Sequence, residues 1–104
     1  MREVLEHIKI MINQVEKKKL LKIIGSQHIK QLVGFFEQME VRNQHGNPYT
    51  EVFISRVFNG KQGNKKVERL IWDFAAVRMK EEEEMQRRRR IILEEHERML
   101  NERK

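Results

Sequence analysis

Apolar residues near the start of the chain recur three and four positions apart, which places them on one side of a helix. This stripe consists of Val4, Leu5, Ile8, Met11, Ile12 and Val15. A lysine run at 17–19 interrupts it, and apolar residues resume before Gly25, a residue type that often ends helices. We therefore predict an amphipathic helix, straight or bent, that ends near Gly25.

The next periodic segment, residues 26–39, predicts a second helix with Ser26 as its N-cap. Its inward positions are Ile29, Leu32, Val33 and Phe36. Gly34 inside this helix costs about 1 kcal/mol relative to Ala, which suggests close packing against another backbone. The following VRNQHGNP stretch clusters Asn, His, Gly and Pro, and predicts a loop.

The stretch NPYTEVFISRVFNGKQGNKK, residues 47–66, contains an apolar run that fits either a strand or a helix. Thr50 is a good N-cap, Tyr49 and Ile54 have the spacing of a hydrophobic staple, and Asn59–Gly60 is a plausible stop. These signals favour a helix at 51–59. Asn64 has the position of an N-cap for a final helix.

The final helix is predicted to begin at Lys65 and to continue to residue 103, because no helix-breaking residue intervenes. Its length would be about 58 Å at roughly 1.5 Å per residue. Its inward face consists of Val67, Leu70, Ile71, Phe74 and Ala75, widened by Trp72 and Val77. Beyond Arg78 the composition becomes strongly charged, with Glu and Arg four residues apart.

A short heptad pattern runs through this charged part of the chain. Met85, Ile92 and Met99 recur every seven residues, with Leu93, His96 and Leu100 between them. Arg89 occupies one inward position. Two interpretations remain open: the segment packs against another helix, in the same chain or a second one, or it is a solvated charged rod.

Length and charge narrow the class of protein. The 104 residues fit one domain, and the net charge of +6 with a pI near 9.8 favours anionic partners such as nucleic acid. The chain has no Cys, so it has no disulfide. Its N-terminus has interleaved charges unlike a signal peptide, and it lacks an uncharged run long enough for a membrane span. We expect a cytoplasmic, nucleoid-associated protein.

The helices at 26–39, 50–59 and from 64 follow the order of a helix-turn-helix domain, whose second helix enters the major groove. The segment FISRVFNGKQGNKKVERLIWDFA, residues 53–75, resembles the C-terminal half of lambda-repressor-like helix-turn-helix domains of phage and bacterial regulators. SQHIKQLVGFF resembles the helix before the turn. The sequence departs from the family at 37–49, EQMEVRNQHGNPY, where the family has a turn of about three or four residues.

The resemblance covers residues 20–78 at most and implies an all-α fold with a helix-turn-helix core. An amphipathic N-terminal helix, residues 1–24, precedes the core, and a charged helical extension, residues 79–104, follows it. Both terminal segments are candidate dimerisation arms. A homodimer is expected because two-fold symmetric proteins match palindromic sites.

The resemblance also implies which residues contact DNA. At the start of helix 51–59, Glu51 and Val52 would face bases, and Ser55 and Arg56 would reach bases or a neighbouring phosphate. The residues that would hold the phosphate backbone are Asn59, Lys61, Gln62, Asn64, Lys65 and Lys66. Phe53, Ile54, Val57 and Phe58 would form the core. Purely structural roles remain open as well, since Ser55 also suits packing between helices and Glu51 suits a helix N-terminus.

Other chemistry has little support in the sequence. The four histidines, His7, His28, His45 and His96, are too widely spaced for a metal site. The GKQGNKK segment lacks the spacing of a nucleotide-binding P-loop. No carboxylate pair lies near a His and a nucleophile. We therefore expect no enzymatic activity, no cofactor, no metal and no small-molecule ligand.

The sequence thus predicts a small sequence-preferring protein that binds double-stranded DNA and regulates transcription. The alternative is a helical interaction module, such as a phage-type inhibitor or adaptor, that works through its long charged helices. RNA binding is less favoured, because the basic loop lacks aromatic residues on which bases stack.

Overall fold

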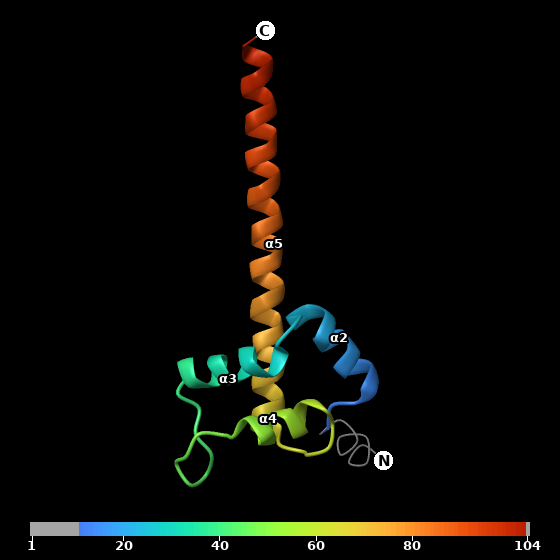
Figure 1. The fold of residues 1–104 in the computed structure, drawn as a ribbon, viewed down its shortest axis with the longest axis vertical. Coiled ribbons are helices and arrows are strands. Elements are labelled where there is room, and N and C mark those ends of the chain that lie inside the picture. Colours follow the sequence, from blue (N-terminus) through green and yellow to red (C-terminus); the bar gives the residue numbers. More distant parts are fainter. Residues whose placement is uncertain (1–10, 104) are drawn as a thin grey trace.

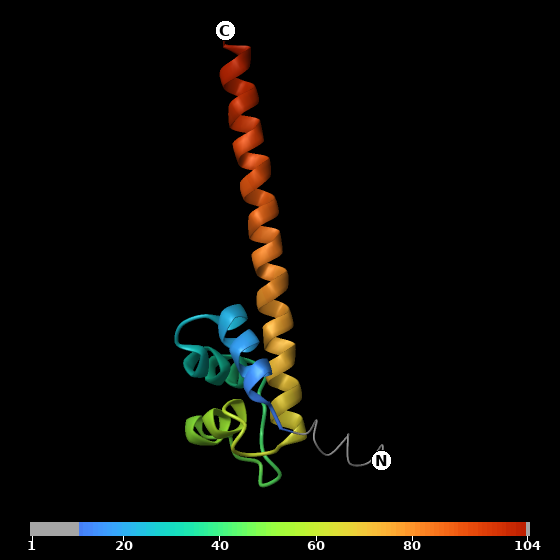
Figure 2. The same ribbon diagram turned by 90° about the vertical axis from the view of Figure 1, so that its right-hand side faces the viewer.

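The structure, a computed structural model, describes residues 11–103 as helices joined by loops (Figure 1). The helices are α2 (Gln14–Ile24), α3 (His28–Gln38), α4 (Glu51–Phe58) and α5 (Lys65–Glu102). No strand occurs within the described range, so the predicted all-α class is confirmed. The short helices gather around the start of α5 and form a head, residues 11–78. The rest of α5, residues 79–102, projects from it as a rod (Figures 1 and 2).

The first described helix, α2, begins later than the apolar stripe predicts. The Asn13 side chain accepts a hydrogen bond from the Glu16 N–H (2.8 Å), and the Glu16 carboxylate accepts one from the Asn13 N–H (3.1 Å). This capping box satisfies N–H groups at the helix start, so the prediction of a helix through residues 11–13 is wrong. The stripe positions 4–8 lie outside the described residues. The stop at Gly25, with φ of 84°, is confirmed.

The start of α3 also differs from the prediction. Ser26 does not cap it; Gln27 precedes the helix with a left-handed backbone (φ 56°) and makes no side-chain cap. Instead, the Gln31 side-chain amide donates to the carbonyls of Ile24 (3.1 Å) and Ser26 (2.8 Å), which ties the end of α2 to α3. The close packing expected at Gly34 is wrong as well, since no described atom lies within 4 Å of a Cβ placed there.

The boundaries of α4 and α5 confirm the predictions. Thr50 accepts a hydrogen bond from the Phe53 N–H (3.1 Å), and Asn64 accepts one from the Val67 N–H (3.0 Å), so each caps its helix. Asn59 follows the last residue of α4, and Gly60 reverses the chain with φ of 74°. Local capping chemistry therefore sets both helices.

The core lies where α2, α3 and α4 meet the first turns of α5. The buried apolar residues are Ile12, Leu20, Ile24, Leu32, Phe36, Val41, Ile54, Val57, Phe58, Val67, Leu70, Ile71 and Ala75. The inward faces predicted for α3 and α5 are thus confirmed in the main. Trp72 and Val77 are 37% and 43% exposed, so the prediction that they widen the inward face of α5 is wrong.

The rod is continuous to residue 102, as predicted, and gives the molecule a longest dimension of 66 Å. Every described residue beyond Arg78 is exposed. Ion pairs one helical turn apart run along it: Glu84 with Arg88 (3.1 Å), Arg78 with Glu81 (3.0 Å), and Glu95 with Arg98. The apolar seam predicted at Met85, Ile92 and Met99 is therefore uncovered in the single chain.

Candidate nucleic-acid interface

The base of the head, opposite the rod, is built by α4 and the loops before and after it (Figures 1 and 2). In Figure 1, α4 lies beneath α3 and runs in the opposite direction. Their connection, residues 39–50, is longer than the three or four residues of a helix-turn-helix turn. α3 ends at Gln38, where left-handed Glu40 (φ 54°) lets the Val41 N–H donate to the Phe36 carbonyl (3.0 Å). α3 is therefore not extended, and the connection contains an inserted loop relative to the turn of the family that the sequence resembles.

The inserted loop is fixed by its own hydrogen bonds. The Asn43 side-chain oxygen accepts from the N–H groups of His45 (2.9 Å) and Asn47 (3.0 Å), and the Asn43 N–H donates to the Asn47 carbonyl (2.7 Å). Gly46, with φ of 80°, supplies the reversal. Gln44 and His45 are consequently held at an exposed tip.

Tyr49 and Lys66 join this loop to α4 and α5. The Tyr49 ring stacks on Phe53, with ring centroids 5.4 Å apart, and meets Phe36 edge-on at 6.3 Å. Lys66 lies 6.0 Å above the Tyr49 ring, and its Nζ donates to the Arg42 carbonyl (2.7 Å). A hollow of about 370 Å³ opens beside these contacts, lined by Asn43, Gln44, His45, Tyr49, Phe53, Gln62 and Asn64.

These elements form one surface, called the base surface below: loop residues 42–45, the exposed side of α4 and residues 61–66. Residues 39–66 contain five basic side chains and two acidic ones, a net charge of +3 with His45 neutral. The basic residues are Arg42, Arg56, Lys61, Lys65 and Lys66, and the acidic ones are Glu40 and Glu51. The base surface is thus suited to an anionic partner.

The structure divides the predicted contact residues of α4 into two groups. Glu51, Val52 and Arg56 are exposed, and Val52 is 68% exposed although it is apolar. Ser55 and Asn59 are half-buried and bonded to each other, because the Asn59 amide donates to the Ser55 carbonyl (2.8 Å) and hydroxyl (3.2 Å). The side chains of Ser55 and Asn59 are therefore used at the end of α4. Those of Glu51, Val52 and Arg56 remain exposed to a partner.

The predicted phosphate contacts after α4 divide in the same way. Lys61, Gln62, Lys65 and Lys66 are exposed, whereas half-buried Asn64 uses its side chain as the α5 cap. At the start of α5, the Asn64 side chain accepts from the Val67 N–H, whereas the N–H groups of Lys65 and Lys66 make no described hydrogen bond. These two N–H groups and the adjacent lysine side chains favour phosphate oxygens.

Sequence reasoning missed the contribution of loop residues 42–45. Their Arg, Asn, Gln and His side chains offer hydrogen-bond donors and acceptors, and this composition was the available signal. Only the fold brings Asn43, Gln44 and His45 to the same hollow as Gln62 and Asn64.

The pKa values of Glu68 and His28 are shifted by their surroundings in the head. Burial raises the pKa of Glu68, as does the charge of Glu16, while the hydrogen bond from the Asn64 N–H (3.2 Å) acts in the opposite direction. Burial, and then the charge of Lys17, lowers the pKa of His28, whose ring lies 4.7 Å from that of Phe58. Both groups therefore bear on stability.

Two further findings concern the described range alone. Between residues 11 and 103, no three His, Asp or Glu side chains are placed to hold a metal ion. None of the helices α2 to α5 is long and apolar enough to cross a membrane.

Comparison with known proteins gives no family for this chain: no protein-family model, no curated protein and no solved structure matches it. The resemblance to lambda-repressor-like domains thus stays a prediction from the motif at residues 53–64.

Proposed function

We propose that this protein binds double-stranded DNA through the base surface and acts as a small transcriptional regulator of phage or bacterial type. The observation that carries the proposal is the joint exposure of Glu51, Val52 and Arg56 on a short helix that is followed by exposed Lys61, Lys65 and Lys66. An α-helix fits the major groove, which is about 12 Å wide.

In this mechanism α4 supplies the base contacts. Arg56 donates to a guanine edge or a phosphate, Glu51 accepts from a cytosine amino group, and Val52 contacts a thymine methyl. Lys61, Lys65 and the first N–H groups of α5 hold the phosphate backbone and fix the orientation of α4.

The inserted loop gives the interface a second edge. Lys66 holds the Arg42 carbonyl, so the loop stays close to the start of α5. Gln44, His45 and Gln62 border the hollow with groups that bond to sugar and phosphate oxygens. The longer turn therefore widens the surface that meets the duplex.

A second candidate function, the helical interaction module, is favoured by one specific observation. The rod exposes Met85, Ile92, Leu93, Met99 and Leu100 by 47% to 66%. Contiguous exposed apolar residues mark protein–protein contacts. DNA binding by the head and a protein contact along the rod are compatible in one molecule.

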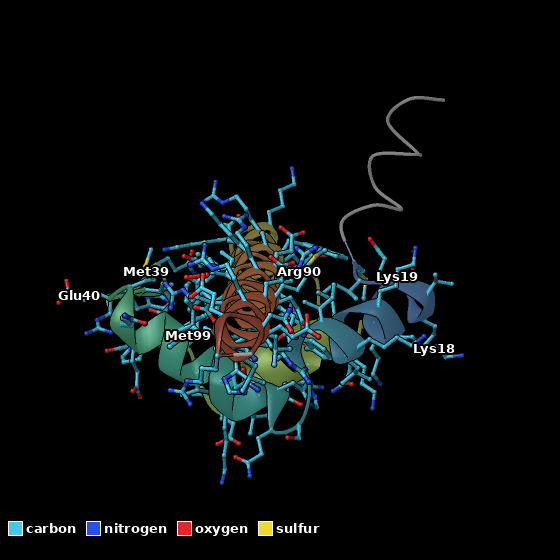
Figure 3. The ribbon with its side chains drawn as sticks, turned by 90° about the horizontal axis from the view of Figure 1, so that it is seen from above. Lys18, Lys19, Met39, Glu40, Arg90 and Met99 are labelled. Atoms are coloured by element: carbon cyan, nitrogen blue, oxygen red, sulfur yellow. The ribbon has the colours of Figure 1, made fainter. Side chains whose placement is uncertain are left out.

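The test compares two double variants in binding to a labelled 30-base-pair duplex, measured by fluorescence anisotropy at two salt concentrations. Arg56→Ala with Lys61→Ala removes two charges from the base surface. Lys18→Ala with Lys19→Ala removes two charges from exposed positions of α2, which Figure 3 shows to one side of the head. The net charge of the two variants is identical, so only location differs.

We expect the base-surface variant to lose about 1–3 kcal/mol of binding free energy for the Arg56 contact, and more with Lys61. Each phosphate contact contributes about 0.9 to the slope of log K against log salt, so the slope should fall by about 1 for the loss of Lys61, and by about 2 where Arg56 also holds a phosphate. The α2 variant should bind nearly as tightly as wild type. Equal affinities and slopes for the two variants would overturn the proposal.

A further inference from the structure

The rod carries an apolar stripe that continues the inward face of α5. At 3.6 residues per turn, Met85, Ile92 and Met99 lie on the same side of the helix as Ile71 and Ala75. In the head, this side is covered by the shorter helices, and Ile71 is fully buried. In the rod it is bare, with Met85 64% and Ile92 66% exposed.

The stripe begins at a hollow where the rod leaves the head. This hollow, of about 400 Å³, is lined by Lys22, Ile23, Arg78, Met79, Glu82 and Glu83. The Arg78 Nε is buried with no hydrogen-bond partner among the described residues, although another guanidinium nitrogen reaches Glu81 (3.0 Å). Arg78 therefore brings to the edge of the hollow a guanidinium group that is only partly paired, and such a group suits a carboxylate.

We propose that a second copy of this chain covers the stripe, with its rod antiparallel to the first. The dimer contact needs no DNA and goes beyond the proposed function. The occupant and the direction follow from three polar positions on the seam, Glu82, Arg89 and His96, which alternate with the apolar ones. In a parallel pair in register, each would face its own copy. Two glutamates and two arginines would then oppose each other inside the contact.

An antiparallel pair removes these like-charge layers. The head covers the inward face up to Arg78, and α5 ends at Glu102, so the free stretch is 79–102. A second copy covers all of it only when the two-fold axis passes between residues 90 and 91. The layers then join Met85 to His96, Ile92 to Arg89 and Met99 to Glu82 of the second copy. Each polar side chain lies against an apolar one, and the aliphatic stem of Arg89 packs along Ile92.

The edges of the seam favour the same direction. In an antiparallel pair, the positions that flank the seam on one side face the same positions of the second copy. Met79 therefore comes close to Leu100 of the second copy, and Gln86 to Leu93 of the second copy, so this edge is largely apolar. On the other edge Arg88 comes close to Glu95. A parallel pair would place each apolar edge against a charged one.

The ends of the contact involve the junction hollow. In this register, Glu102 of the second copy arrives beside Arg78, whose buried Nε is unused. Lys22 borders the same hollow and adds a second cation. Arg78 would then lie between Glu81 of its own chain and the arriving carboxylate, which offsets the repulsion between the two acids.

A second rod has the length of the stripe, since the free stretch 79–102 spans about 36 Å in each copy.

The arrangement has a consequence that does rest on the proposed function. The two copies of α4 lie at opposite ends of the assembly, and the Asn64 residues are separated by about 80 Å along the rod. Half-sites one helical turn apart are about 34–36 Å apart. The dimer would therefore hold two well-separated DNA sites instead of one compact palindrome.

The absence of Cys in the sequence allows a clean cross-linking test without DNA. Glu82→Cys and Met99→Cys are made separately at exposed rod positions, and circular dichroism checks that each remains helical. Each variant alone, and an equal mixture after subunit exchange, is treated with a short bismaleimide. In the antiparallel register, the two copies of either residue are about 25 Å apart, while residues 82 and 99 of different copies are adjacent.

We expect cross-linked dimer only in the mixture, and sedimentation equilibrium should show a dimer of wild type. Cross-linking of each variant with itself would establish a parallel pair and overturn the proposal. No cross-link in any sample, with a monomer at all concentrations in sedimentation, would overturn the second copy as the occupant. Because no DNA is present, these outcomes are independent of whether the base surface binds DNA.

Discussion

Replacing Gly60 with alanine tests how the chain before α2 is attached to the base of the head. Gly60 follows α4 with φ of 74°, in the left-handed region that side chains disfavour. A Cβ at this position would overlap the backbone carbonyl of Ile12, whose side chain is only 5% exposed. The backbone at residue 12 must therefore move, and the burial of Ile12 is at risk.

The expected loss has two parts. The left-handed conformation costs a non-glycine residue about 1–2 kcal/mol, offset by about 0.4–1 kcal/mol because alanine restricts the unfolded chain. Displacing Ile12 loses up to about 1.5–3 kcal/mol of burial. We expect Gly60→Ala to destabilise the head by about 3 kcal/mol, which lowers the melting temperature by roughly 10–20 °C.

The assay is urea and thermal denaturation followed by circular dichroism, with Gly46→Ala as a matched control. Gly46 has a similar φ of 80°, but no described atom lies within 4 Å of its Cβ position. Gly46→Ala should therefore lose about 1 kcal/mol or less, the backbone part alone. Equal losses for the two variants would show that Ile12 does not lie against Gly60, and would refute the attachment.

Two pH predictions follow from the shifted groups. Because the pKa of Glu68 is raised in the folded state, its charge destabilises the fold at neutral pH, and Glu68→Gln should raise the melting temperature there. That gain should vanish below the ordinary value of 4.5, and a gain that persists at pH 3 would contradict the assignment. The pKa of His28 is lowered, so its contribution is present above 6.5 and is lost on acidification. Lowering the pH from 7.5 to 5 should therefore reduce the melting temperature of His28→Phe less than that of wild type. An equal reduction in the two proteins would argue against burial of the imidazole.

The sequence predicts those parts of the fold that depend on neighbouring residues. Thr50 and Asn64 cap their helices because each side chain reaches an N–H three residues on. The capping box of Asn13 and Glu16 depends on local sequence in the same way, but the prediction followed the apolar stripe alone. A cap needs only local geometry, whereas a stripe gives no information on where a helix begins.

Features that depend on distant segments were not predictable. The Gln31 side chain ties the end of α2 to α3, so Ser26 is not used as a cap. The open space beside Gly34 likewise depends on how the whole helices pack. The base surface also depends on contacts between segments that are distant in the sequence. Lys61 and Lys65 are visible in the sequence as basic residues, but the contact of Lys66 with Arg42 joins positions 24 residues apart. The orientation of α3 relative to α4 likewise depends on the inserted loop.

The rod differs from the head in what its apolar residues do for folding. The buried core ends at Ala75, so the apolar side chains of the rod contribute nothing to it. Ile91 lies off the stripe, and a single exposed apolar residue of this kind is normal on a surface. The stripe is different, because Met85, Ile92 and Met99 recur on one side over two heptads, and burial stabilises each such side chain by about 1.5–3 kcal/mol. A rod that only had to stay in water would be expected to carry charged residues at these positions. Of the two interpretations open from the sequence, the arrangement of the rod therefore favours packing against another helix over a solvated rod.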